Sequence, residues 1–232
     1  KINLMSKFQL LLPRMGESVE EATIINWLKN TGDKVEIDDV KQIKINPPLA
    51  FPEKVREVSN ILSNAKKPVL VVGGQIHVST KARKLVSKIA EIYNLPVLCT
   101  YEHQDILSHN HPHYAGELGL RPPEPIRKNA LEADVVLVVG HRFNGVPNMA
   151  YKFPSSKQTF IHVIPDPNTI GKIFRTDMGI VADSKNFLEQ LSTIEKKKTN
   201  KERDEWVKLC HHRFLNNNAT QPPRNANDGL DF

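Results

Sequence analysis

The sequence predicts an α/β fold in which an open, mostly parallel β-sheet carries helices on both faces. Two observations predict it. Short apolar runs such as PVLVV and VVLVV alternate with segments of helical periodicity. The runs are apolar at every position, which is typical of strands buried on both faces. Regular alternation of such strands with helices favours a parallel sheet over an antiparallel one.

The first helix is expected near residues 52–65, since Pro52 suits a first helical turn. Four apolar side chains recur on one face of it: Val55, Val58, Leu62 and Ala65. PVLVVGG (68–74) reads as a buried strand ending in glycines. A helix over 79–93 and the strand LPVLCTY (95–101) continue the alternation.

The second half repeats the pattern after a long loop. A helix is expected near 124–131, then the strand ADVVLVVGH (133–141). The strand TFIHVIPD (159–166) and a short strand MGIVAD (178–183) follow, and helix 184–194 closes the unit. The residue pattern therefore predicts five strands in this part of the chain.

The two ends of the chain show residue patterns that differ from this alternation. Residues 8–37 show short β-like runs separated by turn residues. The segment EKKKTNKER (195–203) precedes an amphipathic helix that carries Trp206 and Phe214, followed by a polar tail. The chain from 196 to 232 is expected to be a linker helix and tail leading toward a further, C-terminal domain.

The composition limits the classes of protein to which this chain can belong. With 39% hydrophobic and 25% charged residues the chain is expected to be globular. No apolar run approaches the ~20 residues of a membrane helix, and the N-terminus lacks the pattern of a signal peptide. The two cysteines, Cys99 and Cys210, form neither a metal spacing nor a disulfide framework. A cytoplasmic protein without a membrane partner is expected.

The net charge of +6 raises the question of nucleic-acid binding. Much of that charge lies in the segment 195–203, where acidic residues are mixed in. A solvated linker explains it better than a nucleic-acid surface, and no nucleic-acid partner is expected.

The candidate ligand site lies at the carboxyl ends of the predicted strands, where parallel α/β sheets bind ligands. These ends carry Gly73-Gly74, Thr100-Tyr101, Gly140-His141-Arg142, Asp166 and Asp183. Glycine lets the backbone approach a phosphate, and arginine can pair with one. An aspartate can accept hydrogen bonds from a ribose. The set suits an adenine nucleotide, although glycines at strand ends equally often serve only as turns.

The histidines of the long loop do not predict a metal site. His103, His109, His111 and His113 lie in a polar segment, where histidines are usually surface residues. A zinc site needs three or four ligands of fixed geometry with supporting contacts. No catalytic residue can be assigned either, because no nucleophile motif is present.

Four segments together resemble the central domain of thiamine-diphosphate-dependent enzymes of the acetolactate synthase type. They are PEKVREVSNILSNAKKPVLVVGG, HPHYAGELGL, ADVVLVVGHRFN and IHVIPDPNTIGKIFRTDMGIVAD. The resemblance assigns residues 39–195 to that domain. It implies a six-stranded Rossmann-like sheet, which in several members binds FAD or an ADP-containing ligand.

The resemblance also implies which residues would contact that nucleotide. The matching positions are Gly73, Gly74, Gly116, Gly119, Gly140, Arg142, Asp166 and Asp183. One position departs from the family pattern: where members often have an acid two residues before the aspartate of the Asp-Pro pair, this chain has Ile164. Some members lack a flavin altogether.

The catalytic parts of that family are expected outside this chain. In the family, a glutamate of the N-terminal domain activates thiamine diphosphate, and a GDG…N motif of the C-terminal domain holds Mg²⁺ and the diphosphate. Neither is found here. The expectation is a fragment of a homo-oligomeric 2-oxo acid decarboxylase or synthase, a lyase or transferase, that is inactive by itself.

The segment FQLLLPRMGESVEEATIINWLKNTGDKVEIDD resembles the first half of a lipoyl domain from a 2-oxo acid dehydrogenase acyltransferase. INPP stands where that family has its modified lysine, so lipoylation of Lys41 or Lys44 is not expected. The following DVKQI resembles the end of the domain that precedes the central domain in the thiamine enzymes. The predicted organisation is thus a partial lipoyl-like segment (1–38), the central domain (39–195) and the C-terminal part (196–232).

Two other interpretations of the chain's function remain open. The chain could be a free-standing adenine-nucleotide-binding module that uses the same strand ends. It could also be a lipoyl carrier protein, although the missing lysine turn speaks against that.

Overall fold

The computed structural model describes residues 47–194 and 201–218. The lipoyl-like segment, its junction with the central domain and the polar tail after residue 218 lie outside the described residues. The domain boundaries proposed at 38/39 and 195/196 therefore stay predictions.

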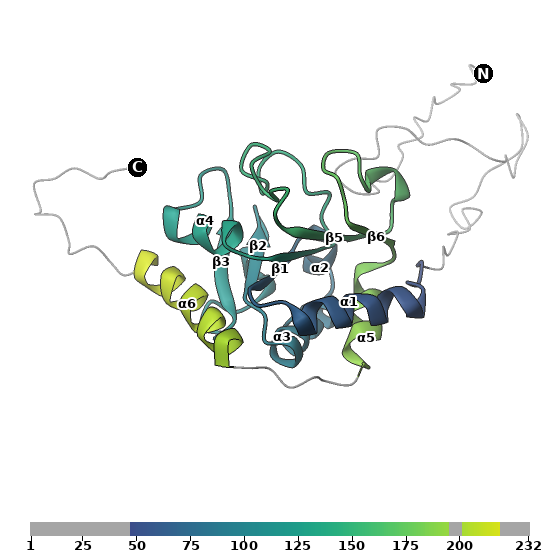
Figure 1. The fold of residues 1–232 in the computed structure, drawn as a ribbon, viewed down its shortest axis with the longest axis horizontal. Helices are drawn as coiled ribbons and strands as arrows, with labels where there is room; N and C mark the ends of the chain where they lie inside the picture. Colours follow the sequence, from purple (N-terminus) through teal and green to yellow (C-terminus); the bar gives the residue numbers. More distant parts are fainter. Residues whose placement is uncertain (1–46, 195–200, 219–232) are drawn as a thin grey trace, which may run out of the picture. The chain divides into compact units, whose positions relative to one another are not determined.

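A six-stranded, entirely parallel sheet forms the centre of the described domain (Figure 1). The strands are β1 (Pro68–Val72), β2 (Val97–Thr100), β3 (Tyr114–Leu118), β4 (Val135–Val139), β5 (Thr159–Ile164) and β6 (Met178–Val181). Their order across the sheet is β3-β2-β1-β4-β5-β6. Central β1 pairs with β2 on one side and β4 on the other, so Val71 lies between Leu98 and Val138. The predicted open, parallel α/β fold is confirmed.

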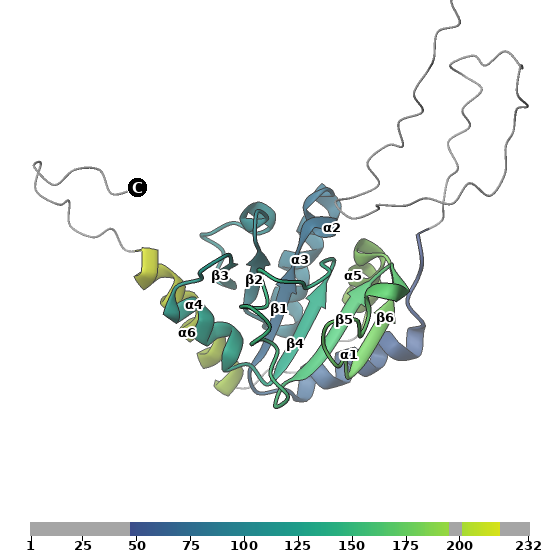
Figure 2. The same cartoon turned by 90° about the horizontal axis from the view of Figure 1, so that it is seen from above.

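Helices cover both faces of this sheet. They are α1 (Pro52–Asn64), α2 (Gly74–His77), α3 (Thr80–Tyr93), α4 (Glu124–Leu131), α5 (Ser184–Ser192) and α6 (Lys201–Asn218), with 3₁₀ turns η2 (Gln104–Ile106) and η3 (Pro167–Thr169). Helices α1, α3 and α5 lie together on one face, while α4 and α6 pack against each other and against β3 (Figures 1 and 2).

Strand β3 is the one strand that the residue pattern missed. Its sequence YAGEL lies within the segment interpreted as a long loop, because Gly116 and Glu117 interrupt the apolar run. Pairing with β2, which includes a register shift, nevertheless buries Tyr114, Ala115 and Leu118. The six-stranded sheet that the family resemblance implied is the correct count.

The predicted helical faces are the buried ones. Val55, Val58 and Leu62 of α1 are all at most 1% exposed. Helix α3 begins where Ser79 Oγ accepts a hydrogen bond from the Ala82 N–H at 3.2 Å. This is the capping role in which serine replaces a missing intrahelical partner.

Helix α6, predicted as a linker helix, lies against the sheet edge. The buried Arg203 guanidinium donates hydrogen bonds to the carbonyl oxygens of Leu62, Ala65 and Tyr93. These carbonyls lie at the C-terminal ends of α1 and α3, where helices leave acceptors without internal partners. Trp206 Nε1 donates to the Pro68 carbonyl at 2.9 Å. Further along the helix, His211 Nδ1 donates to the Tyr114 carbonyl of the edge strand β3 at 2.8 Å. Helix α6 therefore covers this edge strand, which protects it against pairing with other chains.

Candidate functional site

The carboxyl ends of the six strands meet at one edge of the sheet because all the strands are parallel. From β1 the chain proceeds to β2 and β3 on one side, and from β4 it proceeds to β5 and β6 on the other. The topological switch point therefore lies between β1 and β4. In open α/β sheets this is where the connecting segments diverge and ligands bind.

Two glycine turns meet at the switch point and are tied together. After β1, Gly73 N–H donates to the Val139 carbonyl at 3.3 Å, and Gln75 N–H donates to the Gly140 carbonyl at 3.1 Å. Gly140 has a φ of +74°, a conformation that favours glycine. Ser184 Oγ donates to Gln75 Oε1 at 2.7 Å, so the start of α5 joins the same cluster.

Imidazole rings fill the space beside the glycines of the β1 turn. A Cβ added to Gly73 would lie 2.6 Å from His141 Cβ, and one added to Gly74 would lie 2.9 Å from His103 Nε2. Side chains at these positions would collide with the rings. Glycine at positions 73 and 74 lets two histidines approach this turn closely. The strand-end residues predicted from the sequence include His141, whereas His103 was expected to be a surface residue of the long loop.

His141 is held as a neutral imidazole at the end of β4. Its Nδ1 accepts the Phe143 N–H at 2.8 Å, and its carbonyl accepts a hydrogen bond from His162 Nε2 at 2.8 Å. Burial lowers the pKa of His141 to about 4, with smaller contributions from the charges of His103, His162 and Arg142. The ring therefore donates or accepts hydrogen bonds at neutral pH without carrying charge.

This buried histidine makes stability depend on pH. The unfolded chain binds a proton at His141 near the ordinary pKa of about 6.5, whereas the folded protein does so only near pH 4. The stabilisation is complete above pH 6.5 and is lost as the pH falls toward 4. Because the unfolded chain takes up this proton, we expect the free energy of unfolding in urea to fall by about 2 kcal/mol from pH 7 to pH 5. In His141→Asn, whose amide oxygen can accept the same Phe143 N–H, that part should vanish, and an unchanged pH slope would contradict the assignment.

The two predicted aspartates lie after β5 and β6, and both serve as caps. Asp166 Oδ1 accepts the Asn168 N–H and its Oδ2 accepts the Thr169 hydroxyl, each at 2.9 Å. These hydrogen bonds, with a smaller contribution from the Arg142 charge, hold the pKa of Asp166 below its usual range. Asp183 Oδ1 accepts the Asn186 N–H at 2.9 Å, at the start of α5. Each carboxylate keeps further lone pairs for a ligand.

Gly116 and Gly119 lie apart from the switch point, at the outer strand β3. They line a hollow of about 320 Å³ between β3, the start of α4 and the end of α6. Other lining side chains include Tyr101, Glu117 and Arg121. A hollow of this size is at the lower end of the range for small-molecule sites. The eight predicted residues thus divide between the switch point, the loops beside it and this outer hollow.

Ile164, the departure from the family pattern, ends β5 and is 3% exposed. An apolar side chain suits that burial, whereas a carboxylate there would need a partner. The position therefore offers a ligand no acidic group.

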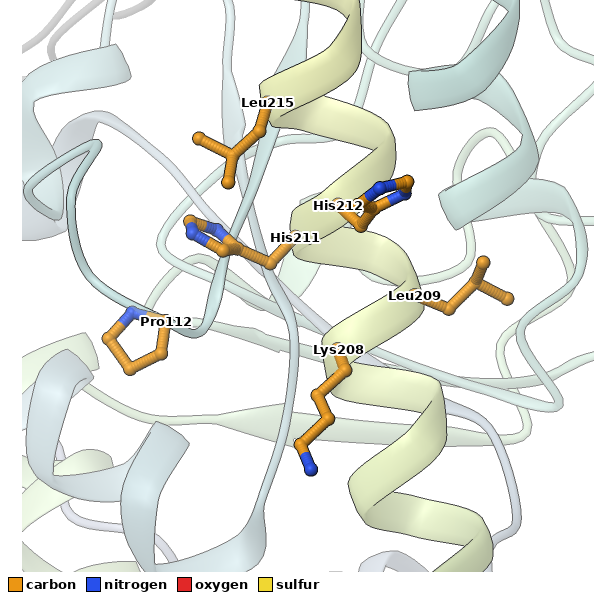
Figure 3. Close-up of a pocket in the computed structure, with 6 residues that line it drawn as sticks. All are labelled: Pro112, Lys208, Leu209, His211, His212 and Leu215. Atoms are coloured by element: carbon orange, nitrogen blue, oxygen red, sulfur yellow. The ribbon is translucent and has the colours of Figure 1, made fainter.

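A second hollow lies on the outer face of α6 and contains none of the predicted residues. Figure 3 shows its lining residues: Pro112, Lys208, Leu209, His211, His212 and Leu215. All but Pro112 come from α6. None of its lining residues lies at the strand ends that carry the glycine turns.

The histidines of the 103–113 segment mostly bond within the fold. His111 contacts Ser87 Oγ at 2.9 Å, and His113 Nδ1 donates to the Leu95 carbonyl at 3.0 Å. His109 packs on the Tyr114 ring. Over residues 47–194 and 201–218, no group of three or more histidine, cysteine or acidic side chains could hold a metal ion. Within the same ranges, no helix is long and apolar enough to cross a bilayer.

The strand order and the switch-point turns define an open α/β domain of the Rossmann type. Residues 55–191 match the family model described as thiamine pyrophosphate enzyme, central domain. The chain belongs to this family.

Similar proteins agree with that assignment. A probable acetolactate synthase large subunit of Methanococcus aeolicus is 30% identical over 153 residues, which cover 66% of this chain and 25% of the relative. The glyoxylate carboligase of Escherichia coli O157:H7 is 26% identical over 181 residues, 76% of this chain and 30% of the relative. The crystal structure of benzoylformate decarboxylase from Polynucleobacter necessarius shares the fold, with a TM-score of 0.53 and 24% identity, over 72% of this chain and 32% of that one. The matched region thus corresponds to about a quarter to a third of each of these proteins.

Proposed function

We propose that this chain provides the central domain of a thiamine-diphosphate-dependent enzyme that decarboxylates a 2-oxo acid and passes on the resulting carbanion, in an acetolactate synthase-like reaction. We also propose that the domain binds FAD or an ADP-containing ligand at the switch point. The observation that carries the second proposal is the pair of tied glycine turns between β1 and β4.

The side chains around these turns suit a nucleotide diphosphate in part. Arg142 is exposed directly after the β4 turn and can pair with a phosphate. Asp166 retains acceptor sites for ribose hydroxyls beside its two capping bonds. Since Ile164 offers no carboxylate, Asp166 carries the ribose contact in this proposal.

The described residues do not fit thiamine diphosphate and Mg²⁺. No group of acidic or histidine side chains in the described ranges could hold a cation, and no GDG…N motif occurs in the sequence. We therefore assign this domain to nucleotide binding and to support of the enzyme. Turnover, in this proposal, needs an activating glutamate and a Mg²⁺-diphosphate motif from other parts of a homo-oligomeric enzyme.

Calorimetric titration of the full chain with FAD and with ADP tests the proposal. We expect saturable binding of at least one of the two, and Arg142→Ala should weaken it about tenfold by removing a charge-assisted hydrogen bond. Arg56→Ala is the matched control because Arg56 is an exposed arginine of α1 that forms a surface ion pair with the exposed Glu53. A folded chain that binds neither FAD nor ADP would overturn the assignment.

A further inference from the structure

The hollow beside the edge strand β3 contains charged and aromatic side chains that the proposed nucleotide site does not use. It has a volume of about 320 Å³. It lies where β3, the start of α4 and the end of α6 come together, three elements that are side by side in Figures 1 and 2. The volume is near the lower limit of about 300 Å³ for small-molecule sites, so it suits one small ligand better than a dinucleotide.

Three aromatic rings in mutual contact line this hollow. The Tyr114 ring lies against His109 with the ring centroids 4.5 Å apart, and Phe214 of α6 meets Tyr114 edge to face at 4.7 Å. Ile126 of α4 adds an aliphatic side chain to the lining. Aromatic side chains bind a further ring through the same offset and edge-to-face contacts. The hollow therefore favours a ligand that carries an aromatic group.

The Tyr114 hydroxyl is an unused hydrogen-bond donor in the hollow. Tyr114 is 1% exposed, yet its hydroxyl forms no hydrogen bond with any residue that the structure describes. Protein atoms do not enclose the hydroxyl completely, so it opens into the hollow that the residue lines. Burial raises the pKa of Tyr114 well above its usual range, with smaller contributions from Cys99 and Glu117. A buried tyrosine hydroxyl usually has a partner, and a ligand in the hollow can supply one here.

Two side chains of opposite charge also line the hollow without neutralising each other. Within residues 47–194 and 201–218, the Arg121 guanidinium forms no ion pair or hydrogen bond. Glu117 Oε1 accepts the Glu102 N–H at 3.2 Å, and in the same ranges no cation pairs with this carboxylate. A ligand with a single charge would satisfy one of these two groups and be repelled by the other. A zwitterion would satisfy both.

We propose that this hollow binds a free α-amino acid with an aromatic side chain. The carboxylate of the ligand pairs with the Arg121 guanidinium, and its ammonium group donates to the Glu117 carboxylate. The Tyr114 hydroxyl is a second donor for the ligand carboxylate, and the ligand ring packs beside Tyr114 and Phe214. This site is separate from the switch point and does not depend on the nucleotide binding proposed above.

Calorimetric titration of the full chain with L-phenylalanine and three analogues tests the proposal. Phenylpropanoate lacks the ammonium group, phenylethylamine lacks the carboxylate, and L-alanine lacks the ring. We expect saturable binding of L-phenylalanine and binding of each analogue that is weaker by about tenfold or more, because each loses a charge-assisted hydrogen bond or the aromatic contacts. Equal affinity for all four compounds, or no binding of L-phenylalanine by the folded chain, would overturn the proposal.

Two variants test which side chain binds which end of the ligand. Arg121→Gln should bind phenylalanine and phenylethylamine equally, because the ligand carboxylate has lost its cationic partner. Glu117→Gln should bind phenylalanine and phenylpropanoate equally, and its amide oxygen can still accept the Glu102 N–H. Arg127→Gln is the matched control, since Arg127 is an exposed arginine of α4 that does not line the hollow. It should bind phenylalanine as wild type does, whereas wild-type preferences in both charge variants would contradict the assigned contacts.

The same titration in the presence of ADP separates this site from the proposed nucleotide site. The affinity for L-phenylalanine should stay unchanged, because the hollow lies at β3 and the glycine turns lie between β1 and β4. Displacement of phenylalanine by ADP would show that the hollow belongs to the nucleotide site and would overturn the inference. A chain that binds phenylalanine but neither ADP nor FAD would support the amino-acid site and defeat only the proposed nucleotide binding.

Discussion

Replacement of Arg203 by alanine is expected to destabilise the described domain by about 4 kcal/mol. The change removes three hydrogen bonds from a charged donor and leaves the carbonyl oxygens of Leu62, Ala65 and Tyr93 without it. Arg203 is 4% exposed, so water cannot readily replace the guanidinium. The free energy of unfolding in urea, followed by circular dichroism, measures the effect.

Arg56→Ala controls for the loss of an arginine as such. Arg56 is exposed on α1, and its ion pair with Glu53 at 3.5 Å is one of the surface pairs that contribute at most about 1 kcal/mol. A loss of less than about 1 kcal/mol in Arg203→Ala would mean that other contacts of α6 hold the helix in place. In that case Trp206, Cys210 and Phe214 would be the residues that fasten the helix.

Replacement of Gly140 by alanine is expected to cost about 3 kcal/mol, the sum of two effects. A side chain at a φ of +74° strains the backbone. The new Cβ would also lie 2.8 Å from Ser184 Oγ and 3.1 Å from Gln75 Cβ, in a cluster fixed by their mutual hydrogen bond. The free energy of unfolding of the variant in urea measures the combined loss from backbone strain and the steric clash.

Gly171→Ala separates the two effects. Gly171 has nearly the same φ, +75°, but a Cβ added there would meet nothing within 4 Å. Only the strain of about 1 kcal/mol should remain in this variant. Equal losses in Gly140→Ala and Gly171→Ala would show that the switch-point turns are not closely packed.

The sheet was predictable where strands are buried on both faces. PVLVV and VVLVV are apolar at every position because helices or loops cover both sides of β1 and β4. Strand β3 was not predictable from pattern, because Gly116 and Glu117 interrupt its apolar run. The burial of β3 depends on its contact with α6, where His211 bonds to Tyr114 over a sequence separation of 97 positions. A periodic residue pattern describes only neighbouring positions, so it cannot reveal such a contact.

The candidate site was predictable only as a set of strand ends. Gly73, Gly74 and Gly140 do meet at the switch point, as parallel topology requires. His141 was predictable among the strand-end residues, because it stands directly after Gly140. The position of His103 beside Gly74 was not predictable, because no local spacing relates the segment after β2 to the turn after β1. The residue roles at these positions stay predictions until ligand binding is measured.

The most direct test of the account is amide hydrogen exchange of the full chain with and without ADP. We predict slower exchange on ADP binding at the turns after β1 and β4, around Gly73–Gln75 and Gly140–Phe143, and in the segment that carries His103. Residues 201–218 of α6 should exchange at the same rate in both samples. Slower exchange confined to α6 and the hollow beside β3, or no change anywhere in a chain that stays folded, would contradict a nucleotide site at the switch point.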